Sequence, residues 1–323
     1  MKIGTLSLSM PFIQAALAGY TDYPMRRLAH QFGCPLTFTG VMLDRIALHP
    51  KAMRQQKFLP YPDEHPVAAQ ILGDDPDIIA QAAAAFERAG YDMIDLNFAC
   101  PVQKVLRRQR GGYLMRKPDL VRQAIRLTRD RVRCPVGIKI RIGFDHTEAS
   151  VEDFWRICEY AAAEQIDLLV IHGRTVGQKY KGKADWLRIA EVKRRFPALT
   201  VFGSGDIFDA DTAFDRMTQT GIDGVIVARG AVGNPWIFSE LLARSQGKPA
   251  PVPPTLAEQA QVMLEHFECV CQVAPASKAV PYFRKFTAGY SKRHPERKKT
   301  LLSLMAARTR DQLIAAVKEA YGV

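Results

Sequence analysis

Short apolar runs alternate with amphipathic stretches along the first three quarters of the chain. The runs have the length and the branched residues of buried strands, and the stretches repeat apolar positions at helical spacing. This alternation predicts repeated strand–helix units and a parallel sheet. The strands predicted in this way span residues 11–17, 36–43, 66–73, 93–97, 136–142, 168–172, 200–203 and 224–228. The helices between them are expected to begin near Pro24, Pro76, Pro118, Val151, Trp186, Asp209 and Pro235.

Eight such units favour a closed α/β barrel of eight parallel strands, a (β/α)8 TIM barrel. The alternative is a doubly wound open sheet, which usually carries a G-x-G-x-x-G turn after its first strand. The sequence has no such turn there. We therefore predict the barrel.

The last quarter of the chain has a different pattern. Residues 247–254 are rich in proline and predict a stiff linker. Beyond them, Thr255 with Glu258 and Thr309 with Gln312 have the spacing of capping boxes that open helices. The sequence thus predicts a barrel domain over residues 1–246 and a small all-helical domain over residues 255–323.

Composition narrows the class of protein. The 323 residues suffice for a barrel of about 250 residues and a small addition. No apolar run approaches the length of a membrane helix, and the first ten residues lack the apolar core of a signal peptide. The six cysteines have no regular spacing, and the Cys269-x-Cys271 pair has no second pair to complete a metal site. We expect a cytoplasmic protein with reduced thiols, no metal and no membrane contact, and we expect a monomer.

The net charge of +12 is concentrated in two windows. Residues 104–133 hold eleven Lys and Arg against two Asp, and residues 278–299 hold eight against one Glu. Clustered positive charge indicates a polyanion partner, although a charge run can also be only a solvated face. Aromatic residues interleave the second window at helical spacing, which is typical of a helix core as well as of a base-stacking surface.

Three Cys-Pro pairs differ in their place relative to the predicted strands. Cys100-Pro101 follows strand 93–97, at the face of a barrel where active sites are built. Cys34-Pro35 and Cys134-Pro135 precede strands, at the opposite, stabilising face. Cys100 is therefore the candidate catalytic residue. The alternative role for Cys100 is that of a small buried apolar side chain.

Other polar residues follow the predicted strands at the same face. Lys139 lies within an otherwise apolar strand, where a charge is costly unless it is paired or faces a ligand. Gly203 to Asp206 and Ala228 to Gly230 follow the last two strands, the usual phosphate site of such barrels, although they could be plain tight turns. A phosphate site with an inward Lys139 and Gln70 suggests flavin mononucleotide (FMN), with Lys139 near the anion of reduced flavin and Gln70 at the ring edge.

At this point the chain resembles the tRNA-dihydrouridine synthase family, and most of all its bacterial B-type branch. The motifs that carry the resemblance are A-G-Y-T-D at 18–22, A-Q-I at 69–71, N-x-x-C-P-x-x-K-V at 97–105, K-I-R-x-G at 139–143, H-G-R-T at 172–175, G-D-I at 205–207, and R-G-A with G-N-P-W at 229–236. The match extends from about Phe12 to Phe238 and continues more weakly in the tail. The chain departs from the family pattern at Ala16-Leu17, at Ser204 and at Ala228, and its 107–112 loop is more basic than the common form.

The resemblance implies an enzyme that uses FMN and NADPH to reduce the C5–C6 double bond of uridine in tRNA. By the family pattern Cys100 is the proton donor to C5, and the target base is extruded from the RNA stack. The implied FMN contacts are Ala16, Leu17, Ala18, Gln70, Lys139, His172, Ser204, Gly205, Asp206, Ala228 and Arg229. Asn97 and Arg174 are the expected uracil contacts, and the expected RNA contacts are Lys104, Arg107, Arg108, Arg110, Arg141, Arg284, Lys285, Lys292 and Arg293.

Two other functions stay open on the sequence. One is an FMN barrel that acts on a free pyrimidine, such as a dihydroorotate or dihydropyrimidine dehydrogenase, which would not need the basic tail. The other is a non-catalytic RNA-binding module, which would not need Cys100, Lys139 and His172 at one face. The sequence does not choose between transfer and ribosomal RNA, between NADPH and NADH, or among uridine positions.

Overall fold

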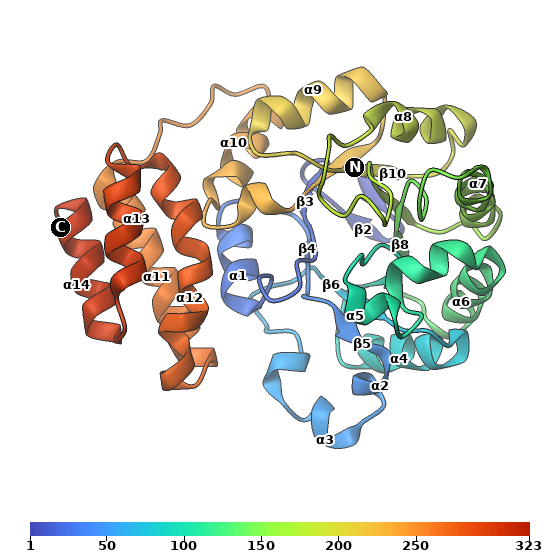
Figure 1. The fold of residues 1–323 in the computed structure, drawn as a ribbon, viewed down its shortest axis with the longest axis horizontal. Helices are drawn as coiled ribbons and strands as arrows, with labels where there is room; N and C mark the ends of the chain where they lie inside the picture. Colours follow the sequence, from blue (N-terminus) through green and yellow to red (C-terminus); the bar gives the residue numbers. More distant parts are fainter.

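A parallel sheet curls into a nearly closed barrel, with helices around it and a group of four helices beside it, in a computed structural model of residues 1–323 (Figure 1). The strand order is β3-β11-β10-β9-β8-β7-β6-β4, with β5 also paired to β6. The two ends of this order meet where the Gln14 amide donates a hydrogen bond to the Leu36 carbonyl, 3.2 Å away. The predicted barrel is confirmed. Its strands are β3 (Phe12–Gln14), β4 (Thr37–Phe38), β5 (Met42–Leu43), β6 (Val67–Leu72), β7 (Met93–Asn97), β8 (Val136–Arg141), β9 (Leu168–His172), β10 (Val201–Ser204) and β11 (Gly224–Val227).

The second barrel strand, predicted as one run over 36–43, is divided into β4 and β5. Thr37 pairs with Val67, whereas Met42 pairs with Ile71, so this strand contains one residue more than its neighbour over the same length. An extra residue bends a strand and redirects its side chains. Here Val41 lies in the bend and faces the barrel mouth.

The barrel interior follows the two-residue period of its strands. Its lower part is apolar and includes Phe38, Met93, Val170 and Phe202, all fully buried. A hairpin of β1 (Lys2–Ile3) and β2 (Leu6–Ser7), which was not predicted, adds Ile3 and Leu8 to this cluster. The next inward positions along the strands are polar. They are Gln70, Asp95, Asn97, Lys139, Arg141, His172 and Ser204.

Side chains cap several of the helices around the barrel at their first turn. Asp22, Asp75, Asp185 and Asp209 each accept a hydrogen bond from an amide in the first turn of the next helix. The predicted helix starts agree with the structure except at Val151: α7 begins at Glu148, three residues earlier, because Thr147 caps it. The helices are α1 (Tyr23–Gln31), α2 (Asp44–Ala47), α3 (Pro50–Met53), α4 (Pro76–Arg88), α5 (Gln103–Leu106), α6 (Pro118–Arg131), α7 (Glu148–Ala163), α8 (Trp186–Arg195), α9 (Ala210–Thr220) and α10 (Trp236–Ser245), with 3-10 turns η1 (Gln56–Phe58), η2 (Gly111–Arg116) and η3 (Arg229–Ala231). None of the helices has both the length and the apolarity to cross a membrane.

The tail forms α11 (Leu256–Val273), α12 (Ala276–Tyr290), η4 (Ser291–Arg293), α13 (Arg297–Ala306) and α14 (Arg310–Tyr321), next to α1 and α10 in Figure 1. Both predicted capping boxes are present. Helix α12 touches the barrel side so closely that a Cβ on Gly289 would lie 1.8 Å from the Val232 carbonyl oxygen. One apolar core continues from the barrel helices into the tail, through Trp236 and Tyr290 among others. The division into separate domains at 246–255 stays a prediction.

Candidate active site

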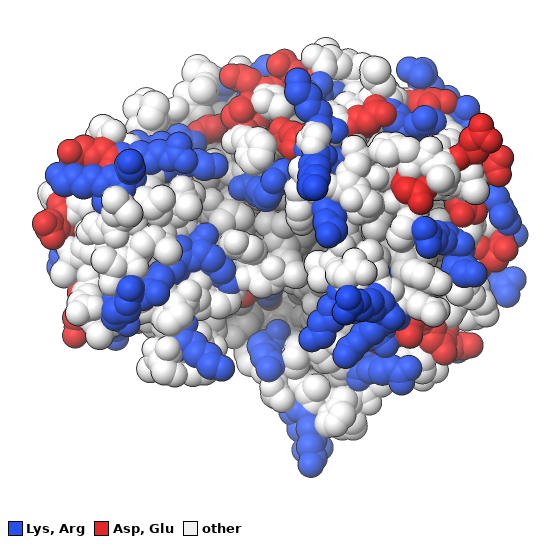
Figure 2. Space-filling view, in the orientation of Figure 1, with Lys and Arg blue, Asp and Glu red and all other residues white.

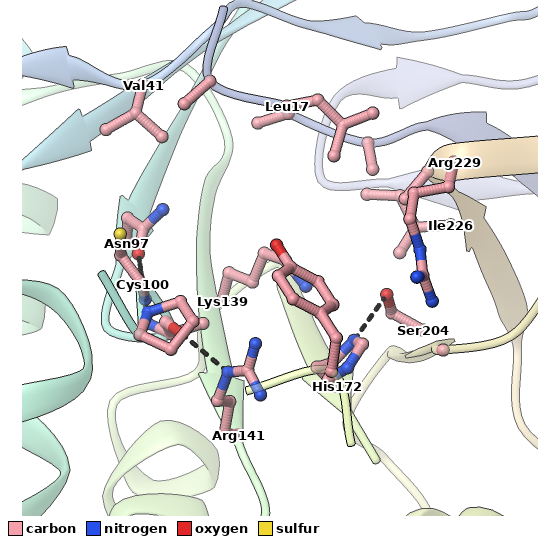
Figure 3. Close-up of a pocket in the computed structure, with 18 of the residues that line it drawn as sticks. Leu17, Val41, Asn97, Cys100, Lys139, Arg141, His172, Ser204, Ile226 and Arg229 are labelled. Atoms are coloured by element: carbon pink, nitrogen blue, oxygen red, sulfur yellow. Dashed lines mark hydrogen bonds between the residues drawn. The ribbon is translucent and has the colours of Figure 1, made fainter. Parts of the chain in front are cut away.

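A pocket opens at the carboxyl ends of the barrel strands and has about 910 Å³ of empty space, counting the part open to solvent. Figure 3 shows Cys100 and Asn97 on one side of it, His172, Ser204 and Arg229 on the other, and Lys139 between them. All eleven residues expected to contact a cofactor line this pocket, as do Cys100, Asn97 and Arg141. The structure thus brings these side chains together, and their contacts with a ligand stay a prediction.

Cys100 lies on a loop that its neighbours hold from several directions. The Asn97 side-chain oxygen accepts hydrogen bonds from the Ala99 and Cys100 amides, at 3.1 and 3.0 Å. The Gly112 amide donates to the Cys100 carbonyl at 3.0 Å, and Arg141 donates from Nε to the Ala99 carbonyl at 2.8 Å. A Cβ on Gly111 would come within 2.9 Å of the Cys100 Cβ, so only glycine fits beneath the thiol. The loop is therefore built to keep the thiol in one place.

The protonation state of this thiol suits a proton donor. Burial raises the pKa of the Cys100 thiol above its ordinary value, although the Val102 amide and the Arg141 charge partly oppose the shift. A raised pKa keeps the sulfur protonated at neutral pH.

We expect the alkylation of Cys100 by iodoacetamide to be slow at neutral pH and to rise only above the pH at which an ordinary thiol ionises, because the thiolate is the reactive species. Mass spectrometry of the peptide that contains Cys100 measures this profile. Fully buried Cys34, whose pKa burial raises to about 12, should remain unmodified and serves as the internal reference. A Cys100 profile with its midpoint well below that of a free thiol would contradict a donor role.

Beneath the pocket, four polar side chains from three strands form a buried cluster. Lys139 is fully buried at Nζ and has no hydrogen-bond partner there. Burial lowers its pKa to about 8, against the opposing attraction of Asp95. Gln70 donates from Nε2 to Asp95 Oδ2 and accepts at Oε1 from Asn97 Nδ2, both at 2.6 Å. Asp95 was not among the predicted site residues, although the inward period of β7 that places Asn97 also places Asp95.

On the other side of the pocket, burial lowers the pKa of His172 well below its ordinary value, and the nearby Lys139 and Arg141 charges lower it further. The imidazole is therefore neutral at physiological pH. Its Nδ1 lies 3.3 Å from the Ser204 hydroxyl. Ser204, where the family pattern has Asn, thus contacts a pocket residue through its side chain.

The turn after β10 has unpartnered backbone donors. The amides of Gly205, Asp206 and Ile207 donate to no group of the protein, and all three residues line the pocket. Gly205 and Asp206 have φ angles of +130° and +56°, a backbone shape that turns successive amides toward one side. Arg229 lies beside this turn and donates to Asp206 at 3.2 Å. This arrangement is suited to an anion such as a phosphate.

Arg174, expected at the uracil, is engaged inside the protein instead. It is 2% exposed, donates to both oxygens of Asp206 and donates to the Lys181 and Gly182 carbonyls. Burial raises the pKa of Asp206, but the hydrogen bond and charge of Arg174, the Ala184 amide and the Arg229 charge together outweigh burial and lower the pKa. Arg174 does not line the pocket, and its contact with a base stays a prediction.

Arg141 also binds the loop after β9, at carbonyls that precede those bound by Arg174. Its Nη1 donates to the Thr175 and Lys179 carbonyls, both at 2.9 Å. Between these anchors, Tyr180 is 57% exposed and lies at the pocket mouth, near both Arg141 and Arg229. Tyr180 was not predicted from the sequence, because a single tyrosine in a polar loop gives no signal until the fold places it.

The basic residues expected at RNA divide into free and engaged groups. Lys104, Arg107 and Arg108 on and after α5 are exposed and form no ion pair, whereas Arg110 is buried against Asp74 at 2.8 Å. Lys and Arg side chains border the central hollow of the molecule on both sides, while most Asp and Glu on this face lie away from it (Figure 2). A polyanion could therefore approach the pocket along this face.

Three of the tail residues make intramolecular contacts. Arg284 donates to the Ala307 carbonyl, and Arg293 is bonded to Glu240 at 2.6 Å. Lys285 donates to the Gly19 carbonyl and lies over the Tyr282 ring, and burial lowers its pKa to about 8. These three side chains hold the tail together or to the barrel. Their contacts with RNA stay a prediction, whereas Lys292, Arg297, Lys298 and Lys299 are exposed.

Comparison with known proteins connects this site to a family. Residues 13–321 match the family model described as dihydrouridine synthase. A probable tRNA-dihydrouridine synthase of Mycobacterium tuberculosis is 35% identical, and the alignment covers 97% of this chain and 82% of that protein. tRNA-dihydrouridine synthase B of Pasteurella multocida is 32% identical over 90% of this chain and 86% of its own.

Solved structures share the barrel at low identity. Histamine dehydrogenase from Rhizobium sp. 4-9 superposes with a TM-score of 0.57 at 12% identity, over 83% of this chain and 50% of that one. An amine oxidase from Pseudomonas geniculata N1 that acts on 6-hydroxypseudooxynicotine gives 0.60 at 14% identity, over 82% and 52%. This chain spans about half the length of those proteins, and the likeness concerns the fold alone.

Proposed function

The chain belongs to the dihydrouridine synthase family, whose members are flavin-dependent oxidoreductases, and we propose that it reduces uridine in tRNA to 5,6-dihydrouridine with FMN as its bound cofactor and NADPH as reductant. The observation that carries the proposal is the pocket itself. A protonated thiol and an unpartnered lysine Nζ line one pocket, at the face of the barrel where such folds perform chemistry.

The residues present fit FMN. The free amides of Gly205 to Ile207, together with Arg229, would bind its phosphate. Lys139 would be the cation beside its ring, since a buried lysine without a partner is costly unless a ligand supplies one. Gln70 has a second amide hydrogen that its contact with Asp95 leaves free to reach the same ring. When bound, FMN supplies the hydride that reduces C6 of the uracil.

The chain's own residues would then complete the reaction. Cys100 holds a proton at Sγ and donates it to C5, and burial keeps that proton in place beforehand. Asn97 has one amide hydrogen beyond its bond to Gln70, which can donate to a uracil carbonyl. Because the pocket lies at the bottom of the barrel mouth, the uridine must leave the RNA stack to reach it.

A visible spectrum of the purified protein tests the cofactor directly. We expect an absorption band at about 450 nm, the region where oxidised flavins absorb, and we expect this band to disappear when NADPH is added in the absence of oxygen. A colourless protein would contradict the flavin assignment and would favour a non-catalytic RNA-binding module.

The proposal also predicts that exposed basic residues of the 104–108 segment and of the tail bind RNA. Replacing Lys104, Arg107 and Arg108 by Gln, or Lys292, Arg297, Lys298 and Lys299 by Gln, should weaken tRNA binding. It should also flatten the slope of log affinity against log salt by about 0.7–0.9 for each phosphate that the variant no longer binds. Titration of labelled tRNA at several salt concentrations measures both quantities, and the flavin content should not change.

A matched control removes exposed charge from the outer barrel wall. Arg88, Arg126 and Arg194 lie on α4, α6 and α8, are exposed and form no ion pair. Their replacement by Gln should leave the salt slope nearly unchanged. If the two test sets and this control weaken binding equally, the effect is one of net charge and no RNA surface has been identified.

A further inference from the structure

A carboxylate beneath the pocket, Asp95 on β7, is tied to Cys100 through a continuous chain of side-chain hydrogen bonds. Asp95 Oδ2 accepts from Gln70, Gln70 accepts from Asn97, and Asn97 accepts from the Cys100 amide. The three side chains come from adjacent strands, because Gln70 pairs with Asp95 across β6 and β7 and Asn97 follows two residues along the same strand. This hydrogen-bond chain is almost entirely buried, since Gln70 and Asp95 are at most 1% exposed and Asn97 is 6% exposed.

The carboxylate of Asp95 orients the amide side chains in this series of hydrogen bonds. An ionised carboxylate can only accept hydrogen bonds, whereas an amide can turn either end toward a neighbour. With Asp95 as acceptor, Gln70 must direct its NH₂ toward Asp95 and its oxygen toward Asn97. Asn97 must then direct its NH₂ toward Gln70, which leaves its oxygen for the two backbone amides of the Cys100 loop.

Opposing effects act on the charge of this buried carboxylate. Burial raises the pKa of Asp95, whereas the hydrogen bond from Gln70 and the charge of Lys139 favour its ionised form. Its other oxygen, Oδ1, has no hydrogen-bond partner. That oxygen lies near Gly137 of β8, where a Cβ would come within 3.1 Å of Oδ1 and 2.7 Å of the Met93 methyl carbon, so glycine at this position leaves room for both side chains.

We propose that Asp95 is a positioning residue for the reaction proposed above: its carboxylate orients the amides of Gln70 and Asn97 and thereby fixes the loop that presents the Cys100 thiol. Asp95 does not line the pocket. Its effect on the reaction passes through the place of Cys100, so it can be measured on the thiol without any RNA.

The test uses the flavin-loaded protein and two substitutions that separate charge from orientation. Asp95→Asn keeps an oxygen that can accept from Gln70, whereas Asp95→Leu has a similar size and no acceptor. Asp44 offers the matched control, because it is another fully buried aspartate with one unpartnered oxygen, and it lies outside the chain and the pocket. Should Asp95→Leu fail to fold, Asp95→Val, which also has no acceptor and suits a strand, replaces it.

The first measurement is the rate of Cys100 alkylation by iodoacetamide at mildly alkaline pH, where part of an accessible thiol is ionised. A loosened loop exposes the thiol, and each unit by which its pKa falls raises the thiolate fraction about tenfold. We expect Asp95→Leu to accelerate alkylation by roughly that factor, Asp95→Asn to stay within about twofold of the parent, and Asp44→Leu to change nothing. Parental reactivity in Asp95→Leu, or in Asp95→Val where the leucine variant fails to fold, would overturn the proposal.

The second measurement is dihydrouridine formation in tRNA. Misplacement of a catalytic group by about 1 Å can cost roughly a hundredfold in rate, so Asp95→Leu should lower kcat by about that factor with little change in KM. Asp95→Asn should restore most of the rate. If even the parent forms no dihydrouridine, the proposed function fails while the alkylation result still decides the role of Asp95. If Asp95→Leu alters alkylation but leaves kcat at the parental value, the assignment as a positioning residue is wrong.

Discussion

Cys100→Ala should keep its flavin and accept hydride from NADPH at the parental rate, yet reduce uridine in tRNA about 10²–10⁴-fold more slowly, the usual effect of losing a general acid. The reason is that Cys100 is the thiol in the pocket, and burial holds its proton at neutral pH. Its loop makes its contacts through backbone atoms, so truncation of the side chain leaves those contacts intact. Single-turnover reduction of tRNA, followed by mass spectrometry of its nucleosides, measures the decrease.

Cys34→Ala is the control for this result. Cys34 precedes β4 at the face of the barrel opposite the pocket, and its buried thiol donates a hydrogen bond to the Leu36 carbonyl. Removing it should cost some stability and leave the rate of a folded sample unchanged. Near-parental turnover in Cys100→Ala would exclude Cys100 as the proton donor, whatever the control does.

Lys139→Met should lose flavin. A hydrogen bond to a charged group contributes about 1.5–3 kcal/mol, so removal of the ammonium should weaken flavin binding roughly ten- to hundredfold. The same change removes a buried ammonium group that has no hydrogen-bond partner in the protein. The flavin-free variant should therefore unfold at no lower temperature than the flavin-free parent, a combination that separates a ligand-binding lysine from a structural one.

Flavin content after dialysis and thermal unfolding of both flavin-free proteins give the two numbers. Lys183→Met provides a comparison, because Lys183 is exposed and does not line the pocket. A Lys139→Met protein with full flavin and a lowered unfolding temperature would mean that the lysine supports the fold through Asp95.

The pattern of the sequence predicted the barrel because strands and helices alternate in every unit, and each unit carries its own local signal. The hairpin of β1 and β2 escaped prediction because two-residue strands have no period to detect. The division of the second strand also escaped, since one extra residue alters the register with β6 and leaves the apolar pattern intact. Such features depend on how a strand pairs with its neighbour, and the local sequence carries no signal for that pairing.

The pocket lining was predictable for a related reason. Residues two apart on a strand face the same side, so the residues after each strand had to meet at one mouth. The partners of charged residues were harder to predict from the sequence. Arg174 and Lys285 have the chemistry of ligand-binding residues, but folding brings Asp206 to the first and the Gly19 carbonyl to the second. Asp95 was missed because its role lies in a hydrogen-bond chain across two strands.

The most direct test of the proposed function is incubation of the purified protein with NADPH and tRNA that lacks dihydrouridine, with nucleoside mass spectrometry as the readout. The proposal predicts that uridine in tRNA gains two hydrogen atoms, that the gain requires both flavin and NADPH, and that Cys100→Ala abolishes most of it. A flavin-loaded protein that reduces a free pyrimidine and leaves tRNA unchanged would contradict it.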